Sequence, residues 1–208
     1  MANSKKMRVI LTLALVLGVT VSAVSFDIKS FPDPIKQGDI LLSGGFGLGV
    51  FYPERIDLTS SLLLGGSFAV EYALPINFAL TVGGEVGFSG SKLKGLFDSD
   101  PETSLLEIPI IARVAWHPNW EVKNLDTYIL AKFGYGIGIW AGDQADYLKN
   151  PRGIIFGTNI GVRYFFIPAL GAFAEGGYEY HFLNYENSYA TFSAFAFKFL
   201  TLGVTFKL

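Results

Sequence analysis

Hydrophobic and polar positions alternate along most of the chain beyond residue 38. From Leu200 to Leu208, for example, every second residue is bulky and apolar, and the residues between them are Thr, Gly, Thr and Lys. A period of two places these two sets on opposite faces of a β-strand. The pattern recurs eight times and predicts strands at residues 39–52, 61–74, 78–88, 106–116, 129–139, 154–166, 170–182 and 200–208. Each segment is about as long as the 9–11 residues with which a tilted strand crosses a hydrocarbon layer.

The two faces of these strands differ in a way that separates a membrane barrel from a soluble one. One face is bulky and apolar, and the other carries mostly Gly, Ala and Ser with one or two charges per strand. A soluble barrel needs a hydrated outer face, whereas small residues with a few charges suit the narrow lumen of an eight-stranded barrel. We therefore predict an all-β fold, a closed antiparallel up-and-down transmembrane β-barrel of eight strands, over residues 39–208.

Aromatic side chains of the bulky face cluster near the strand ends, as interfacial anchoring of Tyr and Trp predicts. The two predicted girdles consist of Tyr72, Phe78, Trp116, Tyr164, Phe166 and Phe206 at one end, and of Tyr52, Phe88, Trp140, Tyr178 and Tyr180 at the other.

Two places break the alternation. Pro109 lies inside the fourth strand, where its missing N–H predicts a bulge. Phe195, Phe197 and Phe199 are out of phase with the residues from Leu200 onward. Either a bulge near Phe199 resets the register, or the preceding part of the strand leaves the membrane, and Lys198 then points inward or lies at the interface.

Composition supports a membrane location without helical spans. Half of the residues are hydrophobic, 16% are charged, and the mean hydropathy is +0.39. After residue 26 no stretch has the roughly 20 unbroken apolar residues of a spanning helix. The net charge of −2 gives no basic footprint for nucleic acid. With no cysteine and two histidines, we expect no disulfide, thiol nucleophile, metal site or cofactor.

The first residues have the pattern of a targeting segment. Lys5, Lys6 and Arg8 precede an uncharged apolar run, and Val21-Ser22-Ala23 offers small residues for cleavage. Residues 1–23 are predicted to be a signal peptide, with a retained anchor as the alternative. Residues 24–38 lack a period and contain two prolines, so we expect a short periplasmic lead-in.

The last strand carries the sharpest motif. Thr201, Gly203, Phe206 and Leu208 follow the order polar, Gly, aromatic, hydrophobic, with Leu208 in place of the commoner terminal Phe or Trp. In this motif and in its overall pattern, the chain resembles the small outer-membrane β-barrel families typified by the transmembrane domain of OmpA, by OmpX and by OmpW. The resemblance implies a monomer in the outer membrane of a bacterium with two membranes, surrounded by lipid and inserted by machinery that reads this last strand. Short turns would face the periplasm and longer loops the outside.

Charged residues on the small face are the candidates for function. The predicted lumen network comprises Glu71, Glu85, Glu107, Arg113, Lys132, Arg163, Glu175, Glu179 and His181. Counting along the strands places Glu85, Lys132, Asn159 and Glu175 near mid-height. Glu71, Arg113 and Arg163 fall nearer the periplasm, and Glu107, Glu179 and His181 fall nearer the outside. Acids and bases at matching heights should pair, because an unpaired buried charge is costly.

Three functions are compatible with such a lumen. The first is a structural or surface-interaction protein plugged by salt bridges, with a modest adhesin role through residues 90–104 and 142–152. The second is a narrow pore for small solutes, although eight strands leave little free space. The third is a lipid A-modifying enzyme, for which only His181 with Ser188 or Ser193 offers a base beside a nucleophile. His117 falls in the turn at residues 117–126 and is expected to be solvated. We predict the first function, with no catalytic site.

Overall fold

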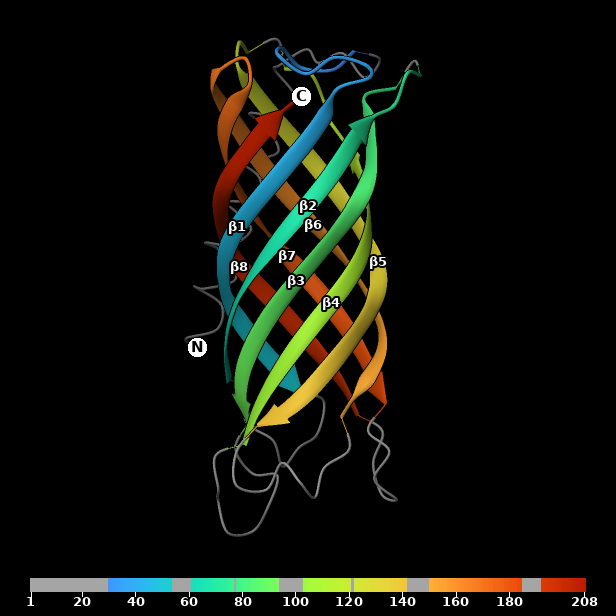
Figure 1. Ribbon diagram of the computed structural model, residues 1–208, viewed down its shortest axis with the longest axis vertical. Helices are drawn as coiled ribbons and strands as arrows, with labels where there is room; N and C mark the ends of the chain where they lie inside the picture. Colours follow the sequence, from blue (N-terminus) through green and yellow to red (C-terminus); the bar gives the residue numbers. More distant parts are fainter. Residues whose placement is uncertain are drawn as a thin grey trace, which may run out of the picture.

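The computed structural model describes residues 30–53, 61–76, 78–93, 103–120, 122–141, 150–184 and 192–208. In these ranges the chain forms eight strands that close into one barrel, each antiparallel to the next, with β8 paired to β1 (Figure 1). The strands are β1 (Ile40–Pro53), β2 (Ser61–Ala73), β3 (Leu80–Leu93), β4 (Thr103–Trp116), β5 (Leu125–Ala141), β6 (Arg152–Ile167), β7 (Leu170–Asn184) and β8 (Phe192–Lys207). The predicted eight-stranded up-and-down barrel is confirmed. Among the described residues no helix is long and apolar enough to cross a membrane.

The two ends of the barrel differ. We call the end at which β1 begins and β8 ends the terminal end, and the other the distal end. At the terminal end, β6 passes to β7 through Pro168 and Ala169 alone, and β2 passes to β3 through residues 74–79. At the distal end, the links at residues 54–60, 94–102, 142–149 and 185–191 lie outside the described residues, as do most of the predicted adhesin segments. The predicted signal peptide also lies outside them.

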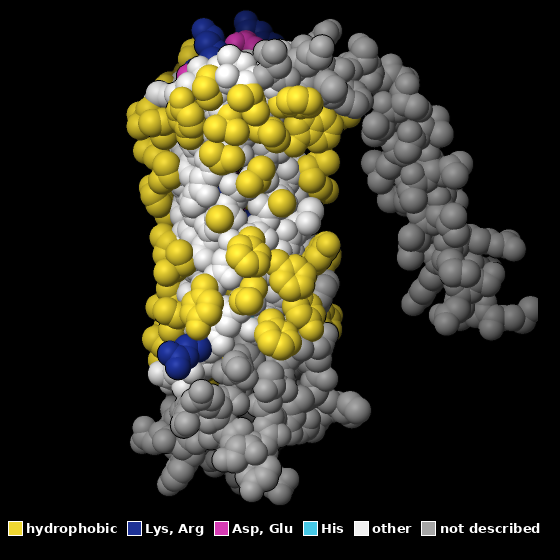
Figure 2. Space-filling model, turned by 90° about the vertical axis from the view of Figure 1, so that its right-hand side faces the viewer, with side chains coloured by type: hydrophobic (Ala, Val, Ile, Leu, Met, Phe, Trp, Pro, Cys, Tyr) yellow, Lys and Arg dark blue, Asp and Glu magenta, His cyan; other side chains and the backbone are white. Residues whose placement is uncertain are grey.

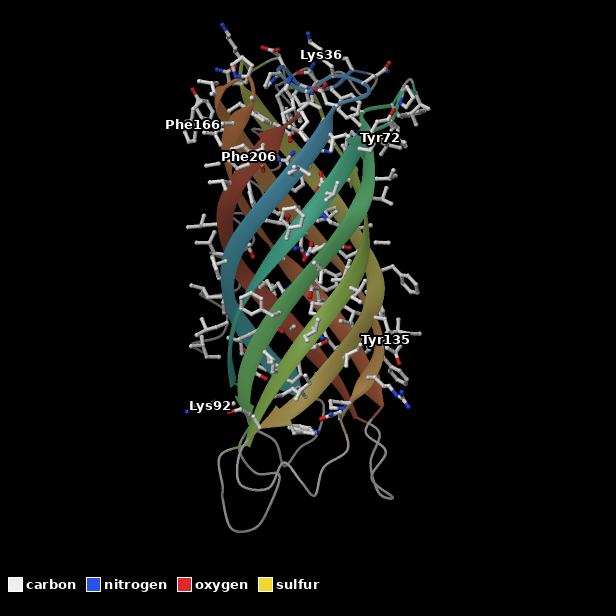
Figure 3. All side chains as sticks on the ribbon, in the orientation of Figure 1. Lys36, Tyr72, Lys92, Tyr135, Phe166 and Phe206 are labelled. Atoms are coloured by element: carbon white, nitrogen blue, oxygen red, sulfur yellow. The ribbon has the colours of Figure 1, made fainter. Side chains whose placement is uncertain are left out.

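Bulky apolar side chains cover the outside of the barrel. Phe46, Phe133 and Ile160 are 74%, 62% and 66% exposed, although each occupies the middle of a strand. Figure 2 shows hydrophobic side chains spread over one face of the cylinder, with Lys and Arg beyond them at both ends. Tyr72, Phe166 and Phe206 point outward near the terminal end (Figure 3). The alternation in the sequence is therefore an alternation between the outer surface and the lumen.

Trp140 was predicted to belong to the distal aromatic girdle, and this prediction is wrong. Its side chain points into the lumen and is 6% exposed. The reason is the period of two, because Trp140 lies an even number of residues after the inward-pointing Lys132 on the same strand. Tyr135, by contrast, points outward from β5 (Figure 3).

The predicted bulge at Pro109 is also wrong. Pairing between β3 and β4 stops at Ile110 and resumes at Glu107 with the register unchanged. Pairing between β4 and β5 runs through Pro109 without a shift. Proline removes a hydrogen-bond donor but adds no residue, so the ladder is interrupted without being displaced. Its buried ring lies over Gly87, where a Cβ would be 3.3 Å from the proline Cγ.

The bulge at Phe199 is confirmed. Leu48 of β1 pairs with Leu200 and Gly49 pairs with Lys198, so Phe199 is the additional residue. The pairing of β7 with β8 shifts at the same place, opposite Gly176. Because of this extra residue, Phe197 before the bulge and Phe199 within it point outward, as do Leu200 and Leu202 after it. Lys198 points into the barrel.

The described part of the lead-in, residues 30–38, lies across the terminal end of the barrel. Phe31 and Ile35 are buried in an apolar cluster with Leu41, Ala73, Ala79 and Phe165, which belong to the barrel or the turn after β2. The Gly38 N–H donates to the Ala73 carbonyl at 2.8 Å, and Lys207 Nζ donates to the Pro34 carbonyl at 2.9 Å. We call residues 30–38 the cap, because they close this end of the lumen with apolar side chains.

Candidate functional site

Every residue of the predicted lumen network lies inside the barrel. Each is at most 5% exposed, and each takes part in at least one ion pair. Inward-pointing residues of neighbouring strands lie close together in the barrel. The lumen of eight strands is too narrow to hold water around each charge, so the charged side chains contact one another. The contacts divide the network into three tiers along the barrel axis.

The middle tier contains Glu85, Arg113, Lys132 and Glu175. The Arg113 guanidinium pairs with Glu85 and, at 3.1 Å, with Glu175. Lys132 Nζ lies 3.3 Å from Glu85 and 3.2 Å from Glu175. Asn159 Nδ2 donates at 2.6 Å to Glu175 Oε1, the oxygen that Lys132 contacts, whereas Arg113 contacts Oε2. Two carboxylates therefore face two permanent cations, so this tier is electrically balanced.

The terminal tier contains Glu71, Asp126, Arg163 and His117. Arg163 binds Asp126 at 2.9 Å and lies 3.6 Å from Glu71. His117 Nδ1 lies 2.8 Å from Asp126, and its Nε2 lies 3.0 Å from the Thr81 hydroxyl. Arg113 of the middle tier reaches Glu71 at 2.9 Å and so links the two tiers.

His117 and Asp126 correct the prediction for this turn. His117 was expected to be solvated, but its side chain is fully buried beneath the Phe31 ring, with ring centroids 5.7 Å apart. Asp126 was assigned to the turn, yet β5 begins at Leu125 and carries Asp126 into the lumen. The sequence contained the signal, because Asp126 and Tyr128 both share the phase of the inward-pointing Lys132.

The arrangement of Asp126, His117 and Thr81 has the order of a carboxylate–imidazole–hydroxyl triad. It lacks the access that such a triad needs for catalysis, because all three side chains are completely buried. The Thr81 hydroxyl also lies within hydrogen-bond distance of Glu71, at 3.3 Å. These contacts fasten the turn after β4 to the barrel wall.

The distal tier contains Glu107, Glu179, Lys198 and His181. Lys198 Nζ binds Glu179 at 2.8 Å, and Lys132 reaches the same oxygen at 3.2 Å. His181 Nδ1 lies 2.9 Å from Glu107, and its Nε2 lies 3.5 Å from Glu179. Lys198 was not included in the predicted network, since its direction depended on the unresolved choice at the Phe199 bulge.

Apolar side chains lie on both sides of the charged tiers. At the terminal end they belong to the cap and its cluster. In the distal half, buried inward-pointing positions hold Phe51, Leu63, Leu105, Trp140 and Ile155. The Phe51 ring meets His181 edge-on, with centroids 6.0 Å apart.

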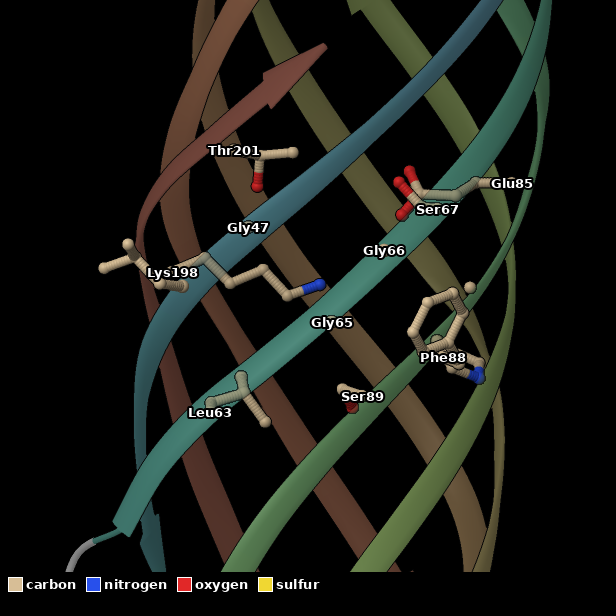
Figure 4. A pocket seen from close by; sticks show the side chains of 13 residues that line it. Gly47, Leu63, Gly65, Gly66, Ser67, Glu85, Phe88, Ser89, Lys198 and Thr201 are labelled. Carbon is tan, nitrogen blue, oxygen red and sulfur yellow. The ribbon is translucent and has the colours of Figure 1, made fainter.

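Two small cavities lie among these side chains. One of about 30 Å³ is bordered by Gly65, Ser67, Ser89 and Lys198, and the Lys198 amino group extends toward it (Figure 4). The second, of about 20 Å³, lies among the side chains of the middle tier. A single water needs roughly 10–15 Å³ of such space, so each cavity has room for one or two waters.

The described contacts do not support the alternative of a lipid A-modifying site at His181. The described contacts of His181 are with carboxylates and the Phe51 ring. Ser188 lies outside the described residues, and of Ser193 only the backbone is described. Among the described residues no group of three or more His, Cys, Asp or Glu side chains is placed to hold a metal ion.

The C-terminal motif is divided between the two faces of β8. Thr201 and Gly203 lie on the lumen side, whereas Phe206 and Leu208, the residue that follows β8, point outward and are 50% and 71% exposed. The structure therefore places the apolar part of the motif on the outer surface.

No protein-family model and no curated protein matches the chain. Among solved structures, Neisserial surface protein A is 14% identical, aligns with 83% of this chain and 98% of its own, and has a TM-score of 0.52. The outer membrane protein OprG from Pseudomonas aeruginosa is 13% identical, aligns with 88% of this chain and 99% of its own, and has a TM-score of 0.49. The likeness to the Neisserial protein supports the predicted fold, that of a small eight-stranded β-barrel.

Proposed function

We propose that the protein is an integral outer-membrane β-barrel with a sealed lumen, and that it serves as a structural or surface-interaction protein. The observation that carries the proposal is the sorting of side chains across the barrel wall. Large apolar side chains are exposed on the outside of all eight strands, while the charges of the lumen are paired inside.

The outer surface fits hydrocarbon rather than water. Contiguous apolar surface larger than a few hundred Å² is unusual on a soluble monomer. A closed barrel also satisfies the backbone hydrogen bonds between its strands, which is the condition for crossing a bilayer without helices. Since β1 pairs with β8, no strand edge is left open, and a single chain is sufficient. We therefore expect a monomer surrounded by outer-membrane lipid.

The inner side chains fit a seal rather than a channel. Balanced ion pairs fill the middle of the lumen, and apolar side chains lie above and below them. Apolar constrictions resist wetting, and paired ions have few free sites for a passing solute. The lumen is therefore expected to hold isolated waters.

Three observations support the outer-membrane location. They are the N-terminal segment with a signal-peptide pattern, the polar–Gly–aromatic–hydrophobic order at the end of the chain, and the barrel fold. We propose that the insertion machinery of the outer membrane recognises the end of the chain through Phe206 of β8 and the following Leu208, whose side chains are exposed on the outside of the barrel.

Membrane fractionation followed by SDS gel electrophoresis of heated and unheated samples tests the location. The expected result is an outer-membrane protein that migrates faster before boiling, because the closed barrel stays compact. Recovery of the chain from the soluble periplasm without detergent would contradict the proposal.

Single-channel recording in planar bilayers tests the seal. We expect no steady conductance at neutral pH. Steady conductance that changes when Lys132 or Glu175 is neutralised would instead favour the narrow pore.

Mass spectrometry of lipid A from cells with the wild-type protein and from cells with His181→Ala tests the enzyme alternative, and we expect identical profiles.

A further inference from the structure

Two of the three tiers contain more acidic than permanently basic side chains. The middle tier has two of each. The terminal tier has two carboxylates and one arginine, and the distal tier has two carboxylates and one lysine. Six carboxylates thus face four Lys and Arg side chains, which leaves a charge of −2. Each of the two unbalanced tiers also contains one histidine, so the lumen is neutral if both imidazoles are protonated.

The geometry around His181 shows where a proton is required. Its Nδ1 lies 2.9 Å from both oxygens of Glu107. Its Nε2 lies 3.5 Å from Glu179 Oε2, within ion-pair distance, and neither of these two buried atoms has a hydrogen-bond partner. An ionised carboxylate only accepts hydrogen bonds, and a neutral imidazole has a single N–H to donate. With one proton, one ring nitrogen would direct its lone pair at a carboxylate oxygen.

We propose that Glu107, His181 and Glu179 form a buried proton-binding site, and that the proton bound at His181 keeps the distal tier neutral and packed. Both N–H groups of the imidazolium then face carboxylates, one from β4 and one from β7. The ligand of this site is the proton, and its release leaves two carboxylates with Lys198 as the only cation belonging to their tier.

The remaining neighbours of His181 do not substitute for that proton. Lys198 of β8 and Lys132 of β5 contact Glu179 rather than the imidazole. Phe51 of β1 presents its ring, and the partners of His181 in register on β6 and β8 are the apolar Ile155 and Ala194. The stabilisation by the imidazolium is therefore present at low pH and lost as pH rises, which is the opposite of the usual behaviour of a carboxylate.

His117 offers an internal comparison within the same chain. Its Nδ1 faces Asp126 at 2.8 Å, but its Nε2 faces the Thr81 hydroxyl at 3.0 Å. A hydroxyl can donate as well as accept, so a neutral imidazole keeps both contacts. The geometry therefore requires a second ring proton at His181 and not at His117.

Nitrogen NMR of the full-length protein in nanodiscs, with ¹⁵N-labelled histidine, tests the site directly. His117 and His181 are the two histidines of the 208-residue chain, so a His117→Gln variant leaves a single imidazole to observe. At pH 7.5 we expect both ring nitrogens of His181 to carry hydrogen. A singly protonated, neutral ring in the folded barrel overturns the proposal.

A Glu107→Gln variant tests the role of the carboxylate. It keeps the shape of the side chain but removes the charge that faces Nδ1, so the proton affinity of His181 should fall at least about tenfold, which lowers its titration midpoint by about one pH unit. An unchanged midpoint in a variant that still migrates as a folded barrel also overturns the proposal. If Glu107→Gln does not fold, Glu179→Gln gives the same test from β7.

Recording in planar bilayers over a range of pH tests the consequence for the seal, and this step rests on the proposed sealed lumen. We expect current fluctuations of the wild-type protein to begin when pH rises above the His181 midpoint. In Glu107→Gln we expect none above its midpoint, because Glu179 and Lys198 balance each other without the proton. A wild-type lumen that is quiet on both sides of the midpoint would overturn the link between the proton and packing. Steady conductance at every pH, with His181 doubly protonated by NMR, would contradict the sealed lumen and leave the proton site standing.

Discussion

Removal of the positive charge at Arg113 is the perturbation that the lumen should tolerate least. Its guanidinium contacts Glu71 at 2.9 Å, Glu175 at 3.1 Å and also Glu85, and the residue is buried. Arg113→Met keeps much of the volume but leaves these three carboxylates to share two other cations, Arg163 at 3.6 Å from Glu71 and Lys132 at 3.2–3.3 Å from the other two. The middle tier then carries a net negative charge.

The magnitude follows from the cost of breaking a buried ion pair, which is typically about 3–5 kcal/mol when one partner is removed. We expect Arg113→Met to lower the free energy of unfolding by at least about 3 kcal/mol, a factor of more than about 100 in the folding equilibrium. Reversible urea unfolding in lipid vesicles, followed by tryptophan fluorescence, measures this difference. Arg152→Met is the matched control, because Arg152 is exposed at the start of β6 and its loss should change stability by less than about 0.5 kcal/mol.

A double variant separates lost charge balance from lost packing. Glu85→Gln removes one of the carboxylates that Arg113→Met leaves unpaired, so the double variant should be more stable than Arg113→Met alone. Full stability of Arg113→Met, or no recovery in the double variant, would show that charge balance around Arg113 does not stabilise the barrel.

Two further predictions concern packing. Gly161→Ala should destabilise the barrel, because the new Cβ would overlap the Tyr128 ring. Gly84→Ala should be tolerated, because its Cβ lies on the outside and meets its first neighbour at 3.8 Å. Urea unfolding compares the two variants, and equal unfolding midpoints would contradict the packing around Gly161. Phe31→Ala should loosen the cap, because Phe31 is buried and fills its apolar cluster. Hydrogen exchange of the Gly38 amide should then become faster, while exchange in the middle of the strands stays the same. Unchanged exchange at Gly38 would mean that the cap is held by its polar contacts alone.

The sequence was sufficient for the fold because side-chain direction in a strand has a period of two. That period placed Glu85, Lys132 and Glu175 on inward positions of three different strands, and the closure of the barrel brings them within ion-pair distance. It also offered the Phe199 bulge as one of two explanations for the change of phase, since an added residue reverses the phase of the pattern, and the structure selects that explanation.

Errors arose where the period was not applied or where it ends. Trp140 was assigned to a girdle by its residue type and its place near a strand end, against the phase of its own strand. At Pro109, the loss of a donor was equated with the insertion of a residue, which is a different perturbation. His117 follows the last residue of β4, and its burial depends on the Phe31 ring, which belongs to an aperiodic segment 86 residues earlier in the chain. Contacts of that kind leave no trace in local pattern.

The central claim is that the bulky face of each strand meets hydrocarbon and the small charged face lines the lumen. A cysteine scan of residues 129–135 in β5 tests it directly, since the natural chain contains no cysteine. With a spin label at each position in lipid vesicles, we expect collisions with oxygen dissolved in the bilayer to be frequent at Ile129, Ala131, Phe133 and Tyr135, and rare at the positions between them. Uniform collision rates, or the reverse alternation, would place the charges against lipid and contradict the account.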